Sequence, residues 1–284
     1  MNSELQNRLM KVVDQMPPFP KSVHRVIALT NDLNCAPKDL VQVIEHDPVI
    51  TMKMLKLVNS AFFGLAKSVT SVRHAVVYLG LNTVKNLALS IATVQCLPSK
   101  STAEFNSNDF LLHSLTTASI AQRIGKELLG KSDTSDLFVT GLLHDFGKVV
   151  LAQFMPEDFG KAIVMARENE MALHEAEMKV IGADHTAIGA MLAEKWELPM
   201  ELAECIRNHH GSDVIGATPD IIDDCVFAAD QISKKLEFGF SGNPIIEEFP
   251  DHMVQRFGMG LDQMIETLGD LSHEVEKAES FIYM

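Results

Sequence analysis

Histidine and aspartate side chains in the second half of the sequence are the residues whose types and spacing could do chemistry. A buried imidazole or carboxylate without a partner costs roughly 1–3 kcal/mol. Groups on different helices of one bundle can satisfy one another by converging on a divalent metal ion, and this donor set suits iron, manganese, zinc or nickel. The candidate ligands, each within or at the end of an expected helix, are His113, His144, Asp145, His185, His209, His210 and Asp230.

Two adjacent pairs in this set carry a geometric constraint. Neighbours in a regular helix point about 100° apart, so His144 and Asp145 cannot face one ion from within a helix. They can do so at a helix end, and we expect Gly147 to supply that end. His209 and His210 meet the same condition because a glycine follows them directly. The spacing therefore allows each pair to face one metal ion from a helix end.

The remaining histidines do not form such a series, and a single histidine on an apolar face is more often a hydrogen-bonded core residue than a ligand. We interpret six as surface or capping residues: His24, His46, His74, His174, His252 and His273.

Apolar spacing predicts helices along most of the chain and no alternating strand pattern, so the expected fold class is all-α. Asp47 followed by Pro48 is typical of a helix start, as is Ser71 before an apolar run. Residues 238–250 are turn-rich, and we expect a surface connection there. The other expected helices cover residues 82–91, 110–128, 135–145, 158–169, 174–181, 185–196, 200–210, 220–236 and 261–283.

Composition indicates a globular protein with two differently charged lobes. The 284 residues are 46% hydrophobic and 22% charged, with a net charge of −14 that opposes general affinity for nucleic acid. Residues 1–100 carry 11 basic and 6 acidic side chains, whereas residues 101–284 carry 13 and 32. We therefore predict an N-terminal helical lobe, 1–100, and a C-terminal lobe, 101–284, joined at the polar, proline-containing stretch 97–102.

The cellular setting can also be predicted. Four cysteines without a Cys-x-x-Cys pair favour a reducing compartment with free thiols. No apolar run approaches the ~18–20 residues of a membrane span, and the first residues lack the apolar centre of a secretory signal. We expect a cytoplasmic protein without membrane insertion.

Several separated motifs carry a resemblance to a known family. His113 and Asp230, together with His144-Asp145 in the run GLLHDFGK (141–148), resemble the HD phosphohydrolase superfamily. Residues 16–20 (MPPFP), 44–48 (IEHDP), 53–64 (KMLKLVNSAFFG) and 73–86 (RHAVVYLGLNTVKN) are similar to the HDOD family, the HD-related output domains of bacterial signalling. The resemblance covers roughly residues 14–236 and implies a two-lobed helical bundle with an HD-type core in its C-terminal lobe.

The resemblance also implies roles for individual residues. His113, His144, Asp145 and Asp230 match the four ligands of a mononuclear HD site. In the related HD-GYP phosphodiesterases, further ligands hold a second metal, and their counterparts here are His185, His209 and His210, with Asp145 in the bridging position. Lys148 matches a lysine of the same motif. The residues after His210, GSDVIGATP, lack the Gly-Tyr-Pro loop of cyclic di-GMP phosphodiesterases.

Two functions follow from these observations. The first is a signal-transduction module that relays signals through contacts with a protein partner, its input arriving through a partner or a separate chain. The alternative is a metal-dependent phosphohydrolase or phosphodiesterase that acts on a nucleotide or phosphoester. In that case Asp145 would bridge or ligate the ions and Lys148 would contact phosphate or hydroxide. We favour the module because of the HDOD-like motifs in residues 1–100, the charge step between the two parts of the chain and the missing Gly-Tyr-Pro loop.

Overall fold

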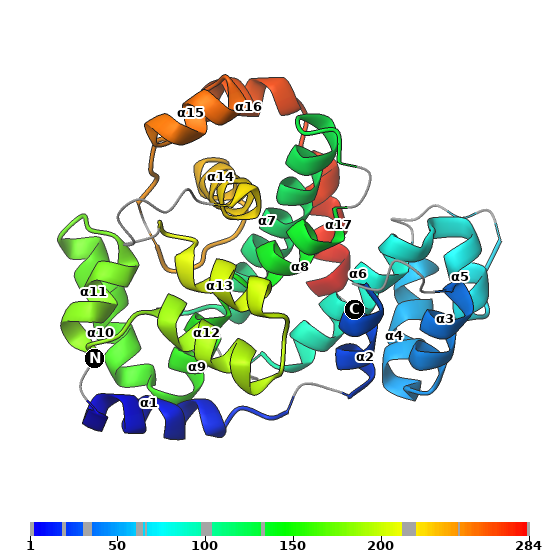
Figure 1. Ribbon diagram of the computed structural model, residues 1–284, viewed down its shortest axis with the longest axis horizontal. Coiled ribbons are helices and arrows are strands. Elements are labelled where there is room, and N and C mark those ends of the chain that lie inside the picture. Colours follow the sequence, from blue (N-terminus) through cyan, green and yellow to red (C-terminus); the bar gives the residue numbers. More distant parts are fainter. Residues whose placement is uncertain are drawn as a thin grey trace. The chain divides into compact units, whose positions relative to one another are not determined.

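The computed structural model describes residues 3–18, 21–30, 36–60, 65, 67–97, 104–131, 134–211, 220–243 and 245–282. These residues form helices and no strand, which confirms the all-α prediction (Figure 1). In chain order the helices are α1 (Ser3–Asp14), α2 (Lys21–Thr30), α3 (Pro37–Glu45), α4 (Pro48–Val58), α5 (Val72–Leu79), α6 (Leu81–Gln95), α7 (Ser107–Glu127), α8 (Ser135–Leu143), α9 (Phe146–Phe154), α10 (Pro156–Glu168), α11 (Leu173–Val180), α12 (His185–Lys195), α13 (Met200–Asn208), α14 (Ile221–Lys235), α15 (Asp251–Phe257), α16 (Leu261–Leu268) and α17 (Ser272–Ile282).

The chain divides into two compact units. The larger comprises Met1–Met16 with Pro98–Glu274, and the smaller comprises Pro17–Leu97 with Val275–Met284. Most of the joining stretch expected at residues 97–102 lies outside the described residues, so the lobe limits 1–100 and 101–284 stay a prediction.

The smaller unit contains the short helices α2 to α6. Helix α4 begins as its sequence predicts, because one carboxylate oxygen of Asp47 accepts hydrogen bonds from the backbone N–H groups of Val49 and Ile50. Ser71 caps α5 in the same way by accepting a hydrogen bond from the N–H of His74. Helix α2 packs against α3 and α6, and α4 packs against α3, α5 and α6. These contacts bury one face of each short helix.

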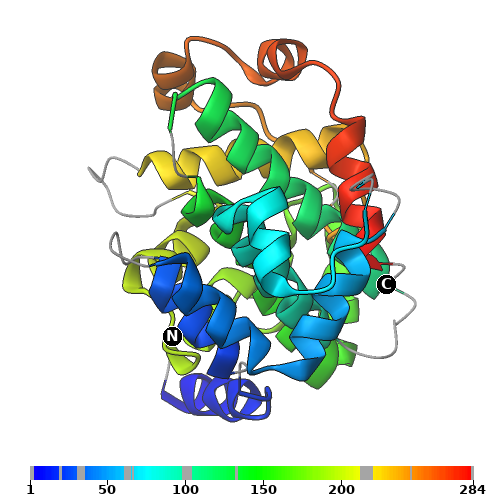
Figure 2. The ribbon, with the colours of Figure 1, turned by 90° about the vertical axis from the view of Figure 1, so that its right-hand side faces the viewer.

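The larger unit is organised around α7, the longest helix described. Helices α8 and α14 pack along α7, while α12 contacts α9 and α13, and α10 pairs with α11. In both ribbon views α15 and α16 lie beside α14 (Figures 1 and 2). Leu261, Met264 and Leu268 of α16 join the apolar core formed with α7 and α14. This packing fixes the relative positions of the helices that carry the candidate histidine and aspartate residues, which are α7, α8, α9, α12, α13 and α14.

Two expected elements differ from the structure. The helix expected over residues 261–283 is two helices within the described residues 261–282, because Gly269 adopts a positive φ of 67° at the end of α16. Gly147 does not end a helix, since α8 ends at Leu143 and Gly147 lies in the first turn of α9. The break falls instead at His144 and Asp145, which are the last cap of α8 and the first cap of α9.

One apolar stretch, Asp136–Phe154, has the length and composition of a membrane-crossing helix. Its apolar window is 89% buried inside the protein, and the stretch is divided between α8 and α9. This is the pattern of core helices.

Gly147 has a packing role in place of the expected terminating one. A Cβ atom at this position would overlap the backbone carbonyl oxygen of His185 and lie 2.8 Å from the backbone nitrogen of Gly189. Helices α9 and α12 therefore touch backbone to backbone at a pair of glycines. Because backbone atoms cannot rotate away as a side chain can, this contact leaves no room for a methyl group.

We expect Gly147→Ala to lower the free energy of unfolding by about 1–3 kcal/mol, because the added methyl group forces α9 and α12 apart. Urea unfolding followed by circular dichroism, with chelator present, measures the change. Gly160→Ala in α10 is the matched control, since its Cβ would meet only the side chain of Glu104 at 3.6 Å. That control should be neutral or raise stability by about 0.5–1 kcal/mol. Equal stabilities for the two variants would contradict the close contact.

Candidate metal centre

The larger unit brings together all seven side chains singled out in the sequence. They come from six helices or helix ends, and their donor atoms form two groups that share one carboxylate. Their positions are His113 within α7, His144 and Asp145 at the break between α8 and α9, His185 at the start of α12, His209 and His210 at the end of α13, and Asp230 within α14.

The first group consists of His113, His144, Asp145 and Asp230, whose donor atoms all lie within 4.8 Å of one another. The Nε2 atom of His113 lies 3.0 Å from Oδ1 of Asp230 and 3.9 Å from Oδ2 of Asp145. The Nε2 atom of His144 lies 3.4 Å from Oδ2 of Asp145 and 3.8 Å from Oδ1 of Asp230. Two imidazoles and two carboxylates thus surround one point.

The second group consists of Asp145, His185, His209 and His210, within the same 4.8 Å limit. The other oxygen of Asp145, Oδ1, lies 3.2 Å from Nε2 of His185 and 3.4 Å from Nε2 of His209. The Nε2 atoms of His185 and His210 are 2.9 Å apart. Asp145 therefore presents one oxygen to each group.

Hydrogen bonds to backbone carbonyls set the tautomers of two imidazoles. Nδ1 of His144 lies 2.7 Å from the carbonyl oxygen of Gly141, and Nδ1 of His209 lies 2.7 Å from that of Ile206. A carbonyl only accepts, so each Nδ1 carries a proton, and Nε2 is the ring nitrogen that faces Asp145. Those two Nε2 atoms, and that of His113, are buried, and the carboxylates near them are not placed for a well-directed hydrogen bond.

A buried glutamate does the same for His185. Oε2 of Glu177 accepts hydrogen bonds from the backbone N–H of His185, at 2.7 Å, and from its Nδ1–H, at 2.6 Å. Both side chains have no exposed surface. The carboxylate therefore fixes the ring and directs the lone pair of Nε2 toward Asp145 and His210. A carboxylate or carbonyl behind the imidazole is the usual arrangement around metal-bound histidine.

Two lysines keep the central carboxylates ionised. Burial opposes the ionisation of Asp145, but the ammonium of Lys148, 2.6 Å away, and the ring of His144 hold the pKa of this carboxyl well below its usual range. Burial likewise opposes ionisation of Asp230, and Lys234 at 3.0 Å holds its pKa well below the usual range. Both aspartates are therefore anionic at neutral pH.

The imidazoles divide into two kinds. Burial lowers the pKa of His209 to about 4. Burial and the neighbouring ring of His209 lower the pKa of His210 well below its usual value. Both imidazoles are therefore neutral at pH 7. Burial also disfavours protonation of His144, yet Asp145 and Asp230 overcome it and raise the pKa of His144 to about 9. A proton thus sits where the two carboxylates attract positive charge, and a metal cation suits the same place.

Sequence reasoning missed several neighbours of this centre. His174, which we expected at the surface, stacks on His210 with ring centroids 4.6 Å apart and planes inclined by 23°. Ser241 is buried and lies 3.3 Å from the ammonium of Lys148, although residues 238–250 were expected to be a surface connection. Glu177 carried one usable signal, because it precedes His185 by eight residues with a tight turn at Gly182 between them.

The geometry defines an all-helical protein with a buried histidine and aspartate centre whose orphaned nitrogens fit a metal ion. The HDOD domain family matches residues 16–212, about two thirds of the chain, and the chain belongs to this family. These buried groups could hold a metal ion, as the sequence predicted.

Similar proteins share the fold over nearly the whole chain. An HDOD domain protein of unknown function from Geobacter sulfurreducens is 25% identical, with a TM-score of 0.79, over 98% of this chain and 96% of its own. A phosphohydrolase-like protein from Shewanella amazonensis SB2B is 25% identical, with a TM-score of 0.67, over 96% and 95%. A signal-transduction-like protein from Marinobacter aquaeolei VT8 is 22% identical, with a TM-score of 0.80, over 99% and 66%, which shows the fold.

A curated relative is longer. An uncharacterized protein of Treponema pallidum (strain Nichols) is 24% identical over 285 residues, and the match covers 98% of this chain but 54% of that protein. The chain therefore spans about half the length of the relative.

We expect Glu177→Gln to weaken the binding of a divalent metal by about 10- to 100-fold, because the neutral amide holds the imidazole of His185 less firmly. Equilibrium dialysis against Mn²⁺ or Zn²⁺, followed by elemental analysis, measures the affinity. Glu175→Gln is the matched control, because this exposed glutamate lies on the same helix. The role given to Glu177 is wrong if both variants bind metal as the wild type does.

Proposed function

We propose that this chain is a signal-transduction module of HDOD type with a two-ion metal centre in its larger unit. One observation carries the metal proposal: the Nε2 atoms of His113, His144 and His209 are buried, make no well-directed hydrogen bond and converge on two ionised carboxylates. Burying a polar atom without a partner destabilises the fold, and a bound cation would give all three nitrogens a partner. In this proposal His113, His144 and Asp230 hold one ion, His185, His209 and His210 hold the other, and Asp145 bridges them.

The charges in the centre support divalent cations. Asp145 and Asp230 are each paired with one lysine, and His209 and His210 are neutral. Imidazole and carboxylate donors in these numbers suit iron, manganese, zinc or nickel, as the sequence suggested. Each Nδ1–H that binds a carbonyl or carboxylate leaves its Nε2 ready to coordinate without a change of tautomer.

Burial favours a structural or sensory role for the ions. Six of the seven candidate ligands are buried, and only His210 is partly exposed. The sequence GSDVIGATP after His210 lacks the Gly-Tyr-Pro motif, and residues 212–219 lie outside the described residues. The contrast between a basic N-terminal part and an acidic remainder supports signalling through a protein partner. We place this signalling in the cytoplasm of a bacterium, as expected from the cysteine content and the family resemblance.

A second function, metal-dependent phosphoester hydrolysis, is favoured by one observation. Asp145 offers an oxygen to each group while the ammonium of Lys148 lies 2.6 Å from it, as expected where paired ions and a lysine bind a phosphoryl group. Divalent metals lower the pKa of bound water toward ~7 and stabilise phosphoryl charge. Lys148 would neutralise a phosphate oxygen, and Asp145 would fix the spacing of the ions. The likeness to the Shewanella phosphohydrolase-like protein agrees with this alternative.

Metal stoichiometry tests the ligand assignment. We expect Asp145→Asn to lose all bound metal, because its carboxylate serves both groups. His113→Ala and His210→Ala should each lose one of two equivalents, because each side chain belongs to a single group. Mass spectrometry of freshly purified, tag-free protein gives the metal content per chain, with circular dichroism to show that each variant is folded. Metal-free wild type after anaerobic loading with iron or manganese would sink the proposal.

Hydrolysis assays separate the two functions. On the module proposal, fully loaded protein leaves p-nitrophenyl phosphate, bis-p-nitrophenyl phosphate and cyclic nucleotides intact. The opposite result, turnover that needs metal and disappears in both Asp145→Asn and Lys148→Met, would establish the phosphohydrolase. Turnover that survives Asp145→Asn points to a contaminating enzyme.

A further inference from the structure

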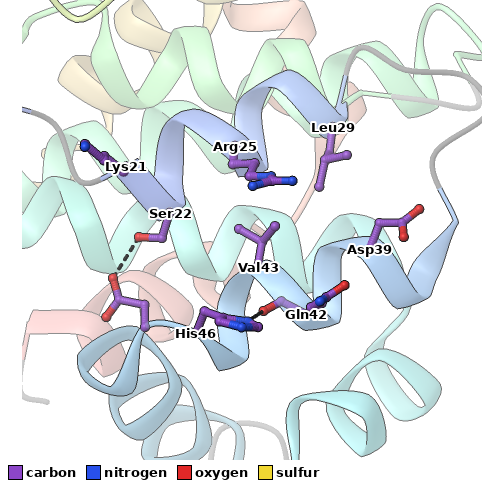
Figure 3. Close-up of a pocket in the computed structure, with 9 residues that line it drawn as sticks. Lys21, Ser22, Arg25, Leu29, Asp39, Gln42, Val43 and His46 are labelled. Atoms are coloured by element: carbon purple, nitrogen blue, oxygen red, sulfur yellow. Dashed lines mark hydrogen bonds between the residues drawn. The ribbon is translucent and has the colours of Figure 1, made fainter.

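A groove between α2 and α3 in the smaller unit has the properties of a ligand site and is independent of the metal centre (Figure 3). The cavity measures about 620 Å³, within the ~300–1,000 Å³ typical of small-molecule sites. Lys21, Arg25 and Leu29 are spaced by four residues and form one wall. Asp39, Val43 and His46 face them from α3.

The wall from α2 carries positive charge that the described part of the chain does not neutralise. Lys21 and Arg25 form no ion pair with a described residue. The first turn of α2 contains no acidic side chain, so the positive end of that helix also faces this region. Figure 3 shows the guanidinium of Arg25 between Leu29 and Val43, directed into the space between the two helices.

One of the two carboxylates that line the groove is already engaged. Asp47 accepts hydrogen bonds from the hydroxyl of Ser22 at 2.7 Å and from the backbone N–H groups of Val49 and Ile50 at 3.1 Å. It therefore serves as the cap of α4 and forms no ion pair with Arg25. Within the described residues no carboxylate pairs with Lys21 or Arg25, so both cations are available to an anionic ligand.

The opposite wall supplies complementary polar groups. Asp39 forms no ion pair with a described residue and can accept hydrogen bonds from hydroxyl or amino groups. Nδ1 of His46 donates to the backbone carbonyl of Gln42 at 2.6 Å, which leaves Nε2 as a second polar atom. Leu29 and Val43 provide apolar surface between these polar ends. The groove therefore matches a molecule with an anionic head and a body that carries hydrogen-bond donors.

We propose that the groove between α2 and α3 binds a small phosphate ester with hydroxyl or amino donors, of the size of a nucleoside monophosphate or sugar phosphate. Arg25, whose guanidinium is directed into the groove, binds the phosphate, and Lys21 adds positive charge one turn earlier on α2. Asp39 accepts hydrogen bonds from the body of the ligand.

Isothermal titration calorimetry of the full-length chain tests the proposal with three probes: AMP, glucose 6-phosphate and inorganic phosphate. All titrations contain chelator, so that phosphate cannot bind metal in the larger unit and failure of the metal proposal leaves this test intact. We expect at least one ester to bind more tightly than inorganic phosphate, and Arg25→Ala to weaken that binding at least tenfold. Lys21→Ala should weaken it less.

Arg73→Ala is the matched control, because this exposed arginine belongs to α5 of the same unit but does not line the groove. It should bind the ester as the wild type does. All the substituted side chains are exposed, and circular dichroism verifies folding. The proposal is overturned if no probe binds, if Arg25→Ala and Arg73→Ala bind alike, or if inorganic phosphate binds as tightly as both esters.

Discussion

The buried carboxylate of Asp145 is the interaction on which the rest of the centre depends. Its two oxygens face different groups of imidazoles, so its position sets the position of both. An anion with about 1% of its surface exposed is stable only if cations or donors surround it, and Lys148 supplies the first of these. Asp145 is the cap of α9 and Lys148 lies in the first turn of that helix, so the helix next to Asp145 also carries the charge that keeps its carboxylate ionised. The break between α8 and α9 thus places the carboxylate of Asp145 beside the ammonium of Lys148, in addition to ending one helix and starting the next.

Two histidines make the same hydrogen bond at the end of a helix. His144 follows the last residue of α8, His209 follows the last residue of α13, and each donates from Nδ1 to a carbonyl oxygen three residues earlier. Carbonyls at a helix end lack partners within the helix, so each ring satisfies one of them. The same hydrogen bond fixes the ring and its tautomer. The hydrogen bond that ends each helix therefore also orients the Nε2 atom of its histidine. Tertiary packing then has only to bring the two helix ends together.

Much of this centre could be predicted from residue type and spacing. The His144-Asp145 and His209-His210 pairs required helix ends, and the structure has helix ends at both. The reason given for the first was wrong, because Gly147 permits a backbone contact with α12 rather than ending α8. Glu177, His174 and Ser241 could not be assigned, since their roles arise from packing between elements distant in sequence. Periodicity shows which face of a helix is buried, but it does not show which partner lies across from it.

The capping histidines have a consequence for how such a protein can diverge. A ring that ends a helix keeps that task whether or not its outer nitrogen coordinates anything, so His144 and His209 contribute to folding independently of any ion. Substitutions at His113 or Asp230, which lie within α7 and α14, would remove the proposed ion binding and leave these helix ends in place. On the proposed ligand set, descendants would lose metal ligands one at a time and still inherit a folded scaffold, whose surface selection could then use for another purpose.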